Sequence, residues 1–234
     1  MIRIGQGPHQ KTLLLVGGGR LARHWRFYFK QLGWSFLTWE RSEGEARWRE
    51  LLPSCHIVAL AISDGAIGAF RDAHLRDFQG KIVHFSGALN LPGTIALHPL
   101  MSFGPDFYPA DFYPRIHFSV TGADNLRDIL PLPNPFTVLP AGDKALYHAL
   151  CVLGGNFPVL LWNQMETELR RLGLPEDGIR LYIARVAENY LARGSAALTG
   201  PLVRKDEGTI RKNLEALQND PWRNVYLAMK EATT

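Results

Sequence analysis

The chain has 234 residues, of which 46% are hydrophobic and 21% are charged, and its formal net charge is +4 at pH 7. This composition is that of a globular protein and excludes a disordered or low-complexity chain. Positive and negative side chains are interleaved along the sequence, so the small positive excess indicates a solvated surface rather than a nucleic-acid-binding face. Cys55 and Cys151 both lie in apolar stretches, which argues against a disulfide framework or a cysteine metal site and favours a reducing compartment.

No segment has the features of a leader peptide or a membrane span. The longest apolar runs, such as residues 12–16 and 56–62, are far shorter than the roughly 18 residues needed to cross a bilayer. Residues 1–11 contain neither the apolar core nor the cleavage site of a signal peptide. We therefore expect a cytoplasmic protein that associates with neither membranes nor nucleic acids.

Short β-rich segments alternate with amphipathic ones over the first part of the chain. Gly33 is placed to terminate the first amphipathic segment, and Pro53 stops the second. Buried strands that alternate with helices are typical of a parallel sheet covered on both faces. The predicted strands are residues 12–16, 35–40, 56–63, 81–86 and 94–98, and the predicted helices are residues 20–33, 44–52 and 66–75.

The pattern changes twice in the remainder of the chain. Residues 99–140 contain eight of the fifteen prolines, so we expect no helix there except a short piece near 125–130, and edge strands at 115–122 and 136–140. From residue 143 onward the periodicity is helical. The predicted helices are residues 143–173, interrupted near Pro158, and residues 176–194, 205–217 and 221–232. The fold class is therefore α/β, with a sheet domain over residues 1–141 and an all-helical substrate and dimerisation domain over residues 142–234.

A glycine-rich turn follows the first predicted strand. Gly17, Gly19 and Ala22 form the GxGxxA pattern between a buried strand and an amphipathic helix. The first glycine permits a tight turn, the second lets the backbone approach a pyrophosphate, and Ala22 allows close helix–strand packing. The N-terminus of the helix offers free N–H groups to the anion. This context predicts a Rossmann-type dinucleotide-binding domain, the alternative being a purely structural turn.

The second predicted strand ends in Glu40-Arg41-Ser42, about twenty residues past the turn. An acidic side chain at this place favours the ribose 2′-hydroxyl of NAD, whereas an arginine beside a serine favours the 2′-phosphate of NADP. The Arg41–Ser42 pair has the more specific chemistry, so we predict NADP as the cofactor, with NAD as the alternative. Arg20 is either a second phosphate contact or a solvated residue.

Polar groups also lie where the later strands end, which is where ligands of such sheets bind. We expect Ser63, Ser86 and Gly87 to line the nicotinamide end. His98 is the candidate proton donor or substrate-orienting group, because imidazole titrates near neutrality; the alternative is a turn cap before Pro99. No metal-ligand spacing and no nucleophile elbow is present. The predicted cofactor contacts are Gly17, Gly19, Arg20, Leu21, Ala22, Arg41, Ser42, Ile62, Ser63, Ser86 and Gly87.

Several segments together resemble a known group of proteins. The segments are the GxGxxA turn and residues 63–67, 84–89, 98–103, 146–157 and 197–206. They are similar to Rossmann-like proteins that carry a C-terminal helical domain of unknown function. That group is related to the superfamily of 6-phosphogluconate dehydrogenase, pyrroline-5-carboxylate reductase and ketopantoate reductase. The resemblance covers most of residues 12–217, with one departure: the group usually has Arg-Gly-Asp where this chain has Arg204-Lys205-Asp206.

The resemblance implies an NADP-dependent oxidoreductase that reduces a small oxo-acid, with 2-dehydropantoate (ketopantoate) as the named substrate. It nominates Asn156 and, second, His148 as catalytic or substrate-contacting residues of the helical domain; the alternative for Asn156 is a structural role at a helix break. An imine or other carbonyl reductase is a second interpretation, because fold does not fix substrate. A third is a dinucleotide-binding sensor or assembly protein without turnover.

The helical domain also carries more apolar surface than it can bury alone. Apolar residues crowd each helix, as at 160–162, 181–186 and 222–229. An exposed patch of that size is unusual for a monomer. Since related reductases often interlock such helices between two chains, we expect a homodimer, in which the turn at residues 199–206 approaches its own or the partner's site.

Overall fold

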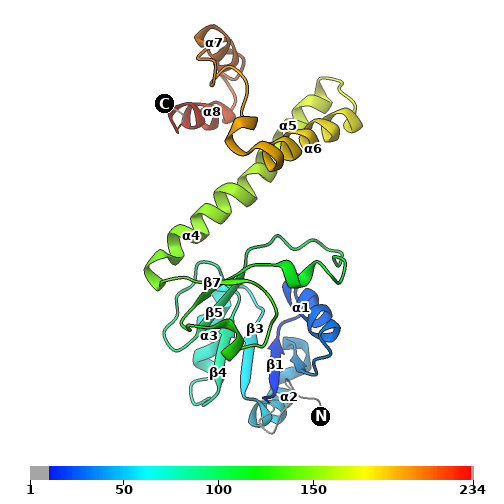
Figure 1. Cartoon of the computed structure of the whole chain (residues 1–234), viewed down its shortest axis with the longest axis vertical. Helices are drawn as coiled ribbons and strands as arrows, with labels where there is room; N and C mark the ends of the chain where they lie inside the picture. Colours follow the sequence, from blue (N-terminus) through cyan, green and yellow to red (C-terminus); the bar gives the residue numbers. More distant parts are fainter. Residues whose placement is uncertain (1–10, 233–234) are drawn as a thin grey trace. The chain divides into compact units, whose positions relative to one another are not determined.

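The structure, a computed structural model, describes residues 11–232. Its contacts divide the chain after Pro158 into two compact units. Within the described residues, the first unit holds the whole β-sheet and the second consists of helices (Figure 1).

The sheet has seven strands in the order β2-β1-β3-β4-β5-β6-β7. From β2 to β5, neighbouring strands are parallel, as predicted, whereas β6 is antiparallel to β5 and parallel to β7. The segment between β5 and β6 forms no crossover helix, and a parallel return would need one. Residues 115–122 were expected at the edge, but β6 is flanked on both sides because β7 pairs beyond it. The strands are β1 Leu13–Val16, β2 Leu37–Trp39, β3 Ile57–Leu60, β4 Lys81–His84, β5 Ile95–Pro99, β6 Phe118–Thr121 and β7 Phe136–Val138.

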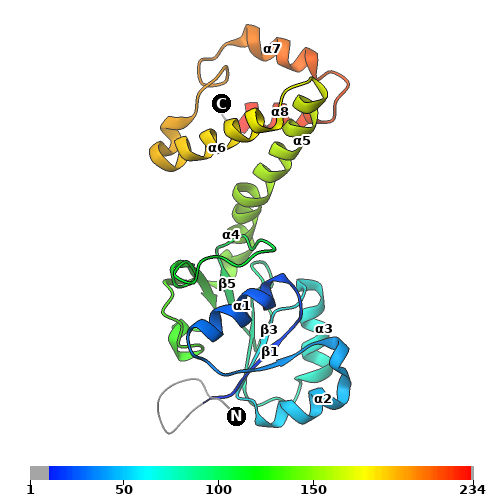
Figure 2. The same cartoon turned by 90° about the vertical axis from the view of Figure 1, so that its right-hand side faces the viewer.

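Helices cover both faces of the sheet (Figure 2). Alternate residues of β1 point to opposite faces: Leu13 packs with Trp25 of α1 (Arg20–Gln31), and Leu14 packs with residues of α2 (Gly44–Leu51) and α3 (Asp64–His74). The Trp25 side chain is fully buried. This two-sided core is what makes β1 and β3 continuous apolar runs in the sequence.

The proline-rich segment between β5 and β7 packs over α1 without forming an α-helix. Apart from β6, its regular pieces are short 3₁₀ turns at Tyr113–Arg115 and Leu126–Asp128, the second of which lies where a short helical piece was predicted. Buried His24 of α1 lies 2.7 Å from the Tyr113 hydroxyl and 3.0 Å from the Gly104 carbonyl oxygen. These contacts attach the segment to the helix that begins at the glycine turn.

The helical region begins earlier than the contact boundary. Its elements are α4 Lys144–Cys151, a π-helical turn Val152–Asn156, α5 Phe157–Arg171, α6 Glu176–Arg193, α7 Glu207–Ala216 and α8 Trp222–Ala232. The interruption expected near Pro158 takes the form of the π-helical turn, after which α5 begins at Phe157 with Pro158 in its first turn. The boundary expected at residue 141 differs from the contact boundary after Pro158. Lys144 of α4 donates a hydrogen bond to the Ser86 carbonyl, so α4 belongs to the sheet unit.

By length and composition alone, one helical run could cross a membrane. It spans Ala141–Arg171, and its most apolar 18-residue window has a mean hydropathy of 1.4 and is not buried. The short apolar runs of the sequence did not predict this, because the stretch is interrupted by small and polar uncharged residues. An exposed apolar surface of this length is uncommon in a monomeric soluble protein.

Candidate functional site

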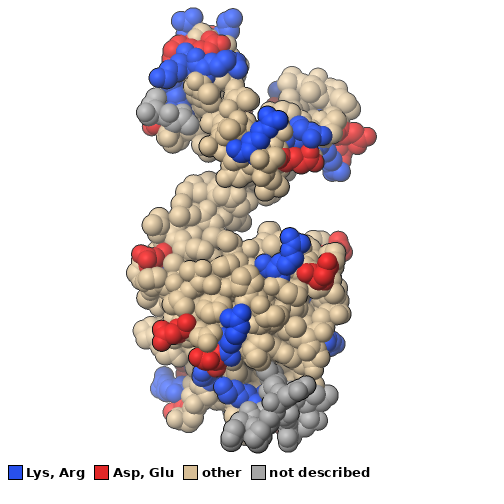
Figure 3. Space-filling model, in the orientation of Figure 1, with Lys and Arg blue, Asp and Glu red and all other residues tan. Residues whose placement is uncertain are grey.

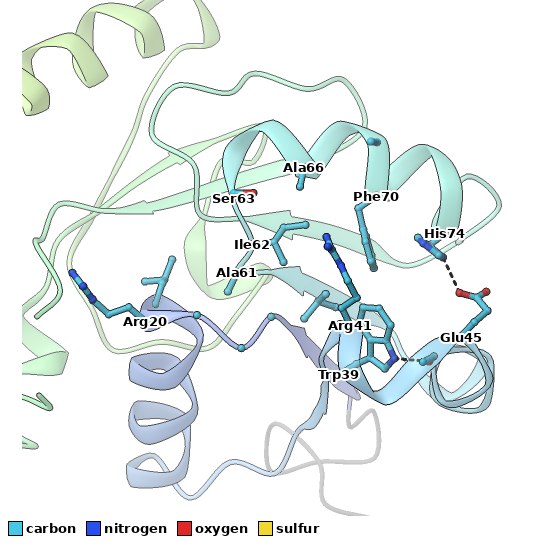
Figure 4. A pocket seen from close by; sticks show the side chains of 17 residues that line it. Arg20, Trp39, Arg41, Glu45, Ala61, Ile62, Ser63, Ala66, Phe70 and His74 are labelled. Carbon is cyan, nitrogen blue, oxygen red and sulfur yellow. Dashed lines mark hydrogen bonds and ion pairs between the residues drawn. The ribbon is translucent and has the colours of Figure 1, made fainter. Parts of the chain in front are cut away.

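A cavity of about 800 Å³ lies at the carboxyl ends of β1, β2 and β3 (Figure 4). Between β1 and β3 the strand order reverses, and sheets of this class bind their ligands at that place. The floor is formed by the glycine turn and the wall by α3 with residues Ala61 to Ser63. The cavity is therefore where the glycine pattern placed a dinucleotide.

The backbone of the turn accounts for its glycines. Gly17 has φ +126°, and a Cβ there would overlap the Ala61 carbonyl, so a larger residue would be strained and would clash. Gly19 is the N-cap of α1, has no side-chain cap, and no acidic residue occupies the first turn. The first N–H groups of α1 are thus left to an anion in the cavity. Ala22 is fully buried beneath the turn and allows the close packing predicted for it.

The far end of the cavity follows β2. Arg41 reaches into it beside Trp39 (Figure 4). Glu45 also lines this end, and its carboxylate is 3.5 Å from His74 Nδ1. Neither Glu40 nor Ser42 is among the lining residues. Arg41 is therefore the charged side chain at this end of the cavity that has no ion-pair partner among residues 11–232.

A second group of polar side chains lies farther along the same edge of the sheet. Lys144, at 1% exposure, donates from Nζ to the Ser86 carbonyl oxygen at 2.8 Å. The Ser86 hydroxyl donates to Asp64 Oδ2 at 2.5 Å. Burial lowers the pKa of Lys144 to about 8, although Asp64 opposes this shift. An ammonium group has three donors, and Ser86 uses one, so Lys144 can also donate to a ligand.

Two imidazoles close over Gly87 beside this lysine. His98 Nδ1 lies 2.8 Å from the Tyr147 hydroxyl, and the His98 and His148 ring centroids are 6.1 Å apart. A Cβ on Gly87 would be 2.9 Å from His98 Nε2 and would overlap His148. Burial, with the charge of Lys144 as the second cause, lowers the pKa of His98 to about 4. His98 is consequently neutral near pH 7, so the ordinary imidazole titration that was the reason for expecting a proton donor here does not apply.

The predicted site residues thus fall into three places, apart from Ala22, which is buried beneath the turn, and Ser42, which is exposed outside the cavity. The residues that line the cavity are Gly17, Gly19, Arg20, Leu21, Arg41, Ile62 and Ser63. Ser86, Gly87, His98 and His148 lie in the polar cluster with Lys144. Asn156 ends the π-helical turn two helical turns beyond His148, and its side chain is exposed. The structure does not bring Asn156 to the cluster.

Sequence reasoning missed Lys144, Asp64 and Tyr147. Lys144, Tyr147 and His148 stand at positions i, i+3 and i+4 of one helix, and this spacing places them on one face. The sequence did contain a signal for this site. Lys144 is the one charged residue of an otherwise uncharged helix, and two polar aromatic residues follow it on the same face. Asp64 is the first residue of α3, directly after Ser63, where a cap or dipole role was the ordinary interpretation.

Comparison with known proteins agrees with this architecture. Residues 127–233 match the model of a family described as Domain of unknown function (DUF2520). No curated protein is similar enough in sequence to count as a relative. Among solved structures, a protein from Bacteroides fragilis described as a candidate NADP oxidoreductase is 19% identical, with a TM-score of 0.74 over 95% of this chain and 97% of that one.

Two further solved structures have the same fold. The reductive aminase from Aspergillus terreus, in complex with NADPH and ethyl levulinate, is 14% identical, with a TM-score of 0.60 over 95% of this chain and 92% of that one. The pyrroline carboxylate reductase of Plasmodium falciparum with NADP bound is 12% identical, with a TM-score of 0.58 over 95% and 96%. The predicted Rossmann-like domain followed by a helical region is confirmed as the fold of this chain.

Proposed function

We propose that the chain is an NADP-dependent oxidoreductase that reduces the carbonyl group of a small oxo-acid, with 2-dehydropantoate as the first substrate to test. The observation that carries the proposal is the pairing, along one sheet edge, of a dinucleotide-sized cavity with a buried lysine. A binding protein would need only the cavity. Burying the Lys144 ammonium, which donates to the Ser86 carbonyl just after β4, costs folding free energy. A buried, perturbed lysine of this kind is typical of a catalytic site.

The residues of the cavity fit a phosphorylated dinucleotide. The uncapped N-terminus of α1 and Arg20 supply donors for a pyrophosphate, and Arg41 supplies a cation for a 2′-phosphate. The names of fold relatives point the same way, since these include an NADP oxidoreductase and proteins solved with NADPH or NADP. When bound, a nicotinamide cofactor supplies the hydride for the reaction.

The polar cluster fits the remaining requirement of the reaction. Reduction of a carbonyl group to a hydroxyl adds a proton to oxygen as well as a hydride to carbon. Lys144 Nζ holds such a proton near pH 7, because its pKa of about 8 keeps most molecules protonated while easing release. Ser86 and Asp64 hold the lysine in place, and the neutral imidazole of His98, with the ring of His148 beside it, orients the substrate.

A second candidate function is reduction of an imine. One fold relative is a reductive aminase, and an imine nitrogen needs a proton from the same position. A third candidate, a sensor without turnover, keeps the cavity but leaves Lys144 unexplained. Oxidation of NADPH by the purified protein, followed at 340 nm with a panel of 2-oxo-acids, ketones and cyclic imines, separates these functions. Tight NADPH binding without turnover on any member of the panel would favour the sensor.

The cofactor assignment predicts the effect of replacing Arg41. Arg41→Ala should weaken NADPH binding by about 1.5–3 kcal/mol, the cost of losing a charge-assisted hydrogen bond, and leave NADH binding nearly unchanged. Arg20→Ala is the matched control, because a pyrophosphate contact is common to both cofactors and both should weaken alike. Dissociation constants measured by calorimetry would contradict the assignment if Arg41→Ala weakened both cofactors equally.

We also propose that the chain is a homodimer of cytoplasmic location, joined through its helices. Residues 145–165 contain no Lys, Arg, Asp or Glu, and the space-filling view shows uncharged surface along this stretch (Figure 3). In the second unit, Leu181, Tyr190 and Leu191 are 65%, 64% and 83% exposed. A second copy is the simplest cover. Burial of Lys144 in the sheet unit argues against placing this helix in a membrane.

The dimer predicts a mass. Light scattering at micromolar concentration should give twice the 26.3 kDa of one chain, because an obligate interface buries on the order of 2,000 Å² or more of mainly apolar surface. Leu181→Glu should weaken association, whereas Lys212→Glu, on the exposed surface of α7, should not. A monomer in aqueous buffer would overturn the dimer, and solubility only in detergent would favour a membrane instead.

A further inference from the structure

The residue directly after β2 is Glu40, an acidic residue, although the next residue, Arg41, is suited to bind a phosphate. In folds of this class, an acidic side chain at this place ordinarily accepts hydrogen bonds from the ribose 2′-hydroxyl of NAD. Here Glu40 is not among the residues that line the cavity, while Trp39 and Arg41 on either side of it are. The position of its carboxylate therefore bears on which dinucleotide the chain prefers.

The Glu40 carboxylate is held by Arg26 from the middle of α1. Arg26 Nη2 lies 2.7 Å from Glu40 Oε1 and also donates to the Gly17 carbonyl oxygen at 2.7 Å. The other carboxylate oxygen lies against Gly18, where a Cβ would overlap it. Arg26 thus joins α1, the glycine turn and the end of β2, and its side chain is only 26% exposed.

The other two carboxylates of this segment are also engaged. Glu43 Oε2 accepts from the Glu40 backbone N–H at 2.7 Å, and Glu45 Oε1 accepts from Arg49 Nε at 3.1 Å. Among residues 11–232, Arg41 makes no ion pair. The cavity therefore presents the Arg41 guanidinium at the end that follows β2. The charge of the adjacent Glu40 is balanced by Arg26, outside the cavity.

We propose that Arg26 determines cofactor preference by holding the Glu40 carboxylate under the glycine turn, which leaves the ribose end of the cavity to Arg41. This inference rests on the proposed function. Without the Arg26 cation, the Glu40 carboxylate has no ion pair and keeps only the hydrogen bond from the Glu43 backbone N–H, so its negative charge is no longer balanced near the place of the 2′-substituent. It then repels the 2′-phosphate of NADPH and is free to accept from the 2′-hydroxyl of NADH.

The test is a comparison of dissociation constants for NADPH and NADH, measured by quenching of tryptophan fluorescence, for which Trp39 in the cavity wall is a reporter. Arg26→Gln removes the charge and keeps an N–H donor for the Gly17 carbonyl. The preference for NADPH over NADH should fall by about tenfold, the factor that corresponds to one such interaction. In the double variant Arg26→Gln with Glu40→Gln, the preference should return.

The outcomes separate this inference from a structural role and from failure of the proposed function. If Arg26 only supports the turn, Arg26→Gln weakens both cofactors alike, and the proposal is overturned. Glu40→Gln alone provides a test should Arg26→Gln fail to fold: its NADPH preference should equal that of the unaltered protein. A selective loss of NADH binding in Glu40→Gln would show that Glu40 already contacts the ribose. If the unaltered protein binds neither dinucleotide, the proposed function itself fails.

Discussion

Replacing Lys144 by methionine is expected to lower the turnover of carbonyl reduction by about 10²–10⁴-fold, the contribution of a positioned proton donor. Methionine fills a similar volume and carries no charge into the buried site, so the fold should persist. The binding of NADPH should remain unchanged, because Lys144 does not line the dinucleotide cavity. Steady-state kinetics with the best substrate of the panel, together with NADPH titrations, make the measurement.

The pH dependence of the unaltered protein provides an independent readout of the same group. Burial lowers the pKa of Lys144 to about 8, below the ordinary value of 10.5. The proton needed for reduction is therefore present below pH 8 and is lost as the pH rises through that value, so kcat/KM should decline on the alkaline side. His98, with its pKa lowered to about 4, should add no ionisation between pH 6 and pH 8.

Two observations would contradict the role of Lys144. One is an alkaline decline that persists unchanged in Lys144→Met, because the titrating group would then be elsewhere. The other is a loss of turnover in Lys144→Met that is smaller than about tenfold. Lys30→Met is the control, since Lys30 is an exposed lysine of the same unit and its replacement should leave both the rate and its pH profile as they were.

The dinucleotide cavity could be predicted from the sequence because its determinants are local. The glycine turn, the buried strand before it and the amphipathic helix after it occupy residues 12–33, and each restricts the backbone of the next. Trp25 and Phe29 were expected on the buried face of that helix, and both are fully buried. Arg41 was placed at the end of the second predicted strand, about twenty residues past the turn, and it lines the cavity.

The polar cluster could not be predicted in the same way, because it depends on contacts between distant parts of the chain. Lys144 and Ser86 are 58 positions apart, and nothing in residues 143–151 says that the lysine faces the sheet rather than solvent. Burial also lowers the pKa of His98 to about 4. His98 was selected from the sequence because a free imidazole titrates near neutrality, and that reason no longer holds. The direction of β6 escaped prediction as well, because a proline-rich connection does not specify whether the strand returns parallel or antiparallel.

A further large effect is expected where the two imidazoles meet the backbone at Gly87. A Cβ at this position would be 2.9 Å from His98 Nε2 and would overlap the His148 ring. Gly87→Ala should therefore displace the imidazoles, and with them the first turn of α4 that carries Lys144. Displacement of a reacting group by about 1 Å can cost 10²-fold in rate, so we expect a loss of about that size.

The measurement is turnover compared with NADPH binding in Gly87→Ala and in a matched variant. Gly68→Ala is the match: Gly68 lies in α3, a Cβ there meets no atom within 4 Å, and alanine is favoured in a helix. Gly68→Ala should keep both properties. In Gly87→Ala, turnover should fall while the thermal unfolding midpoint stays within a few degrees, because His98 and His148 are only partly buried and can move without opening the core. Full turnover in Gly87→Ala would mean that His98 and His148 need not stand where the structure places them, and the substrate-orienting role assigned to them would have to be withdrawn.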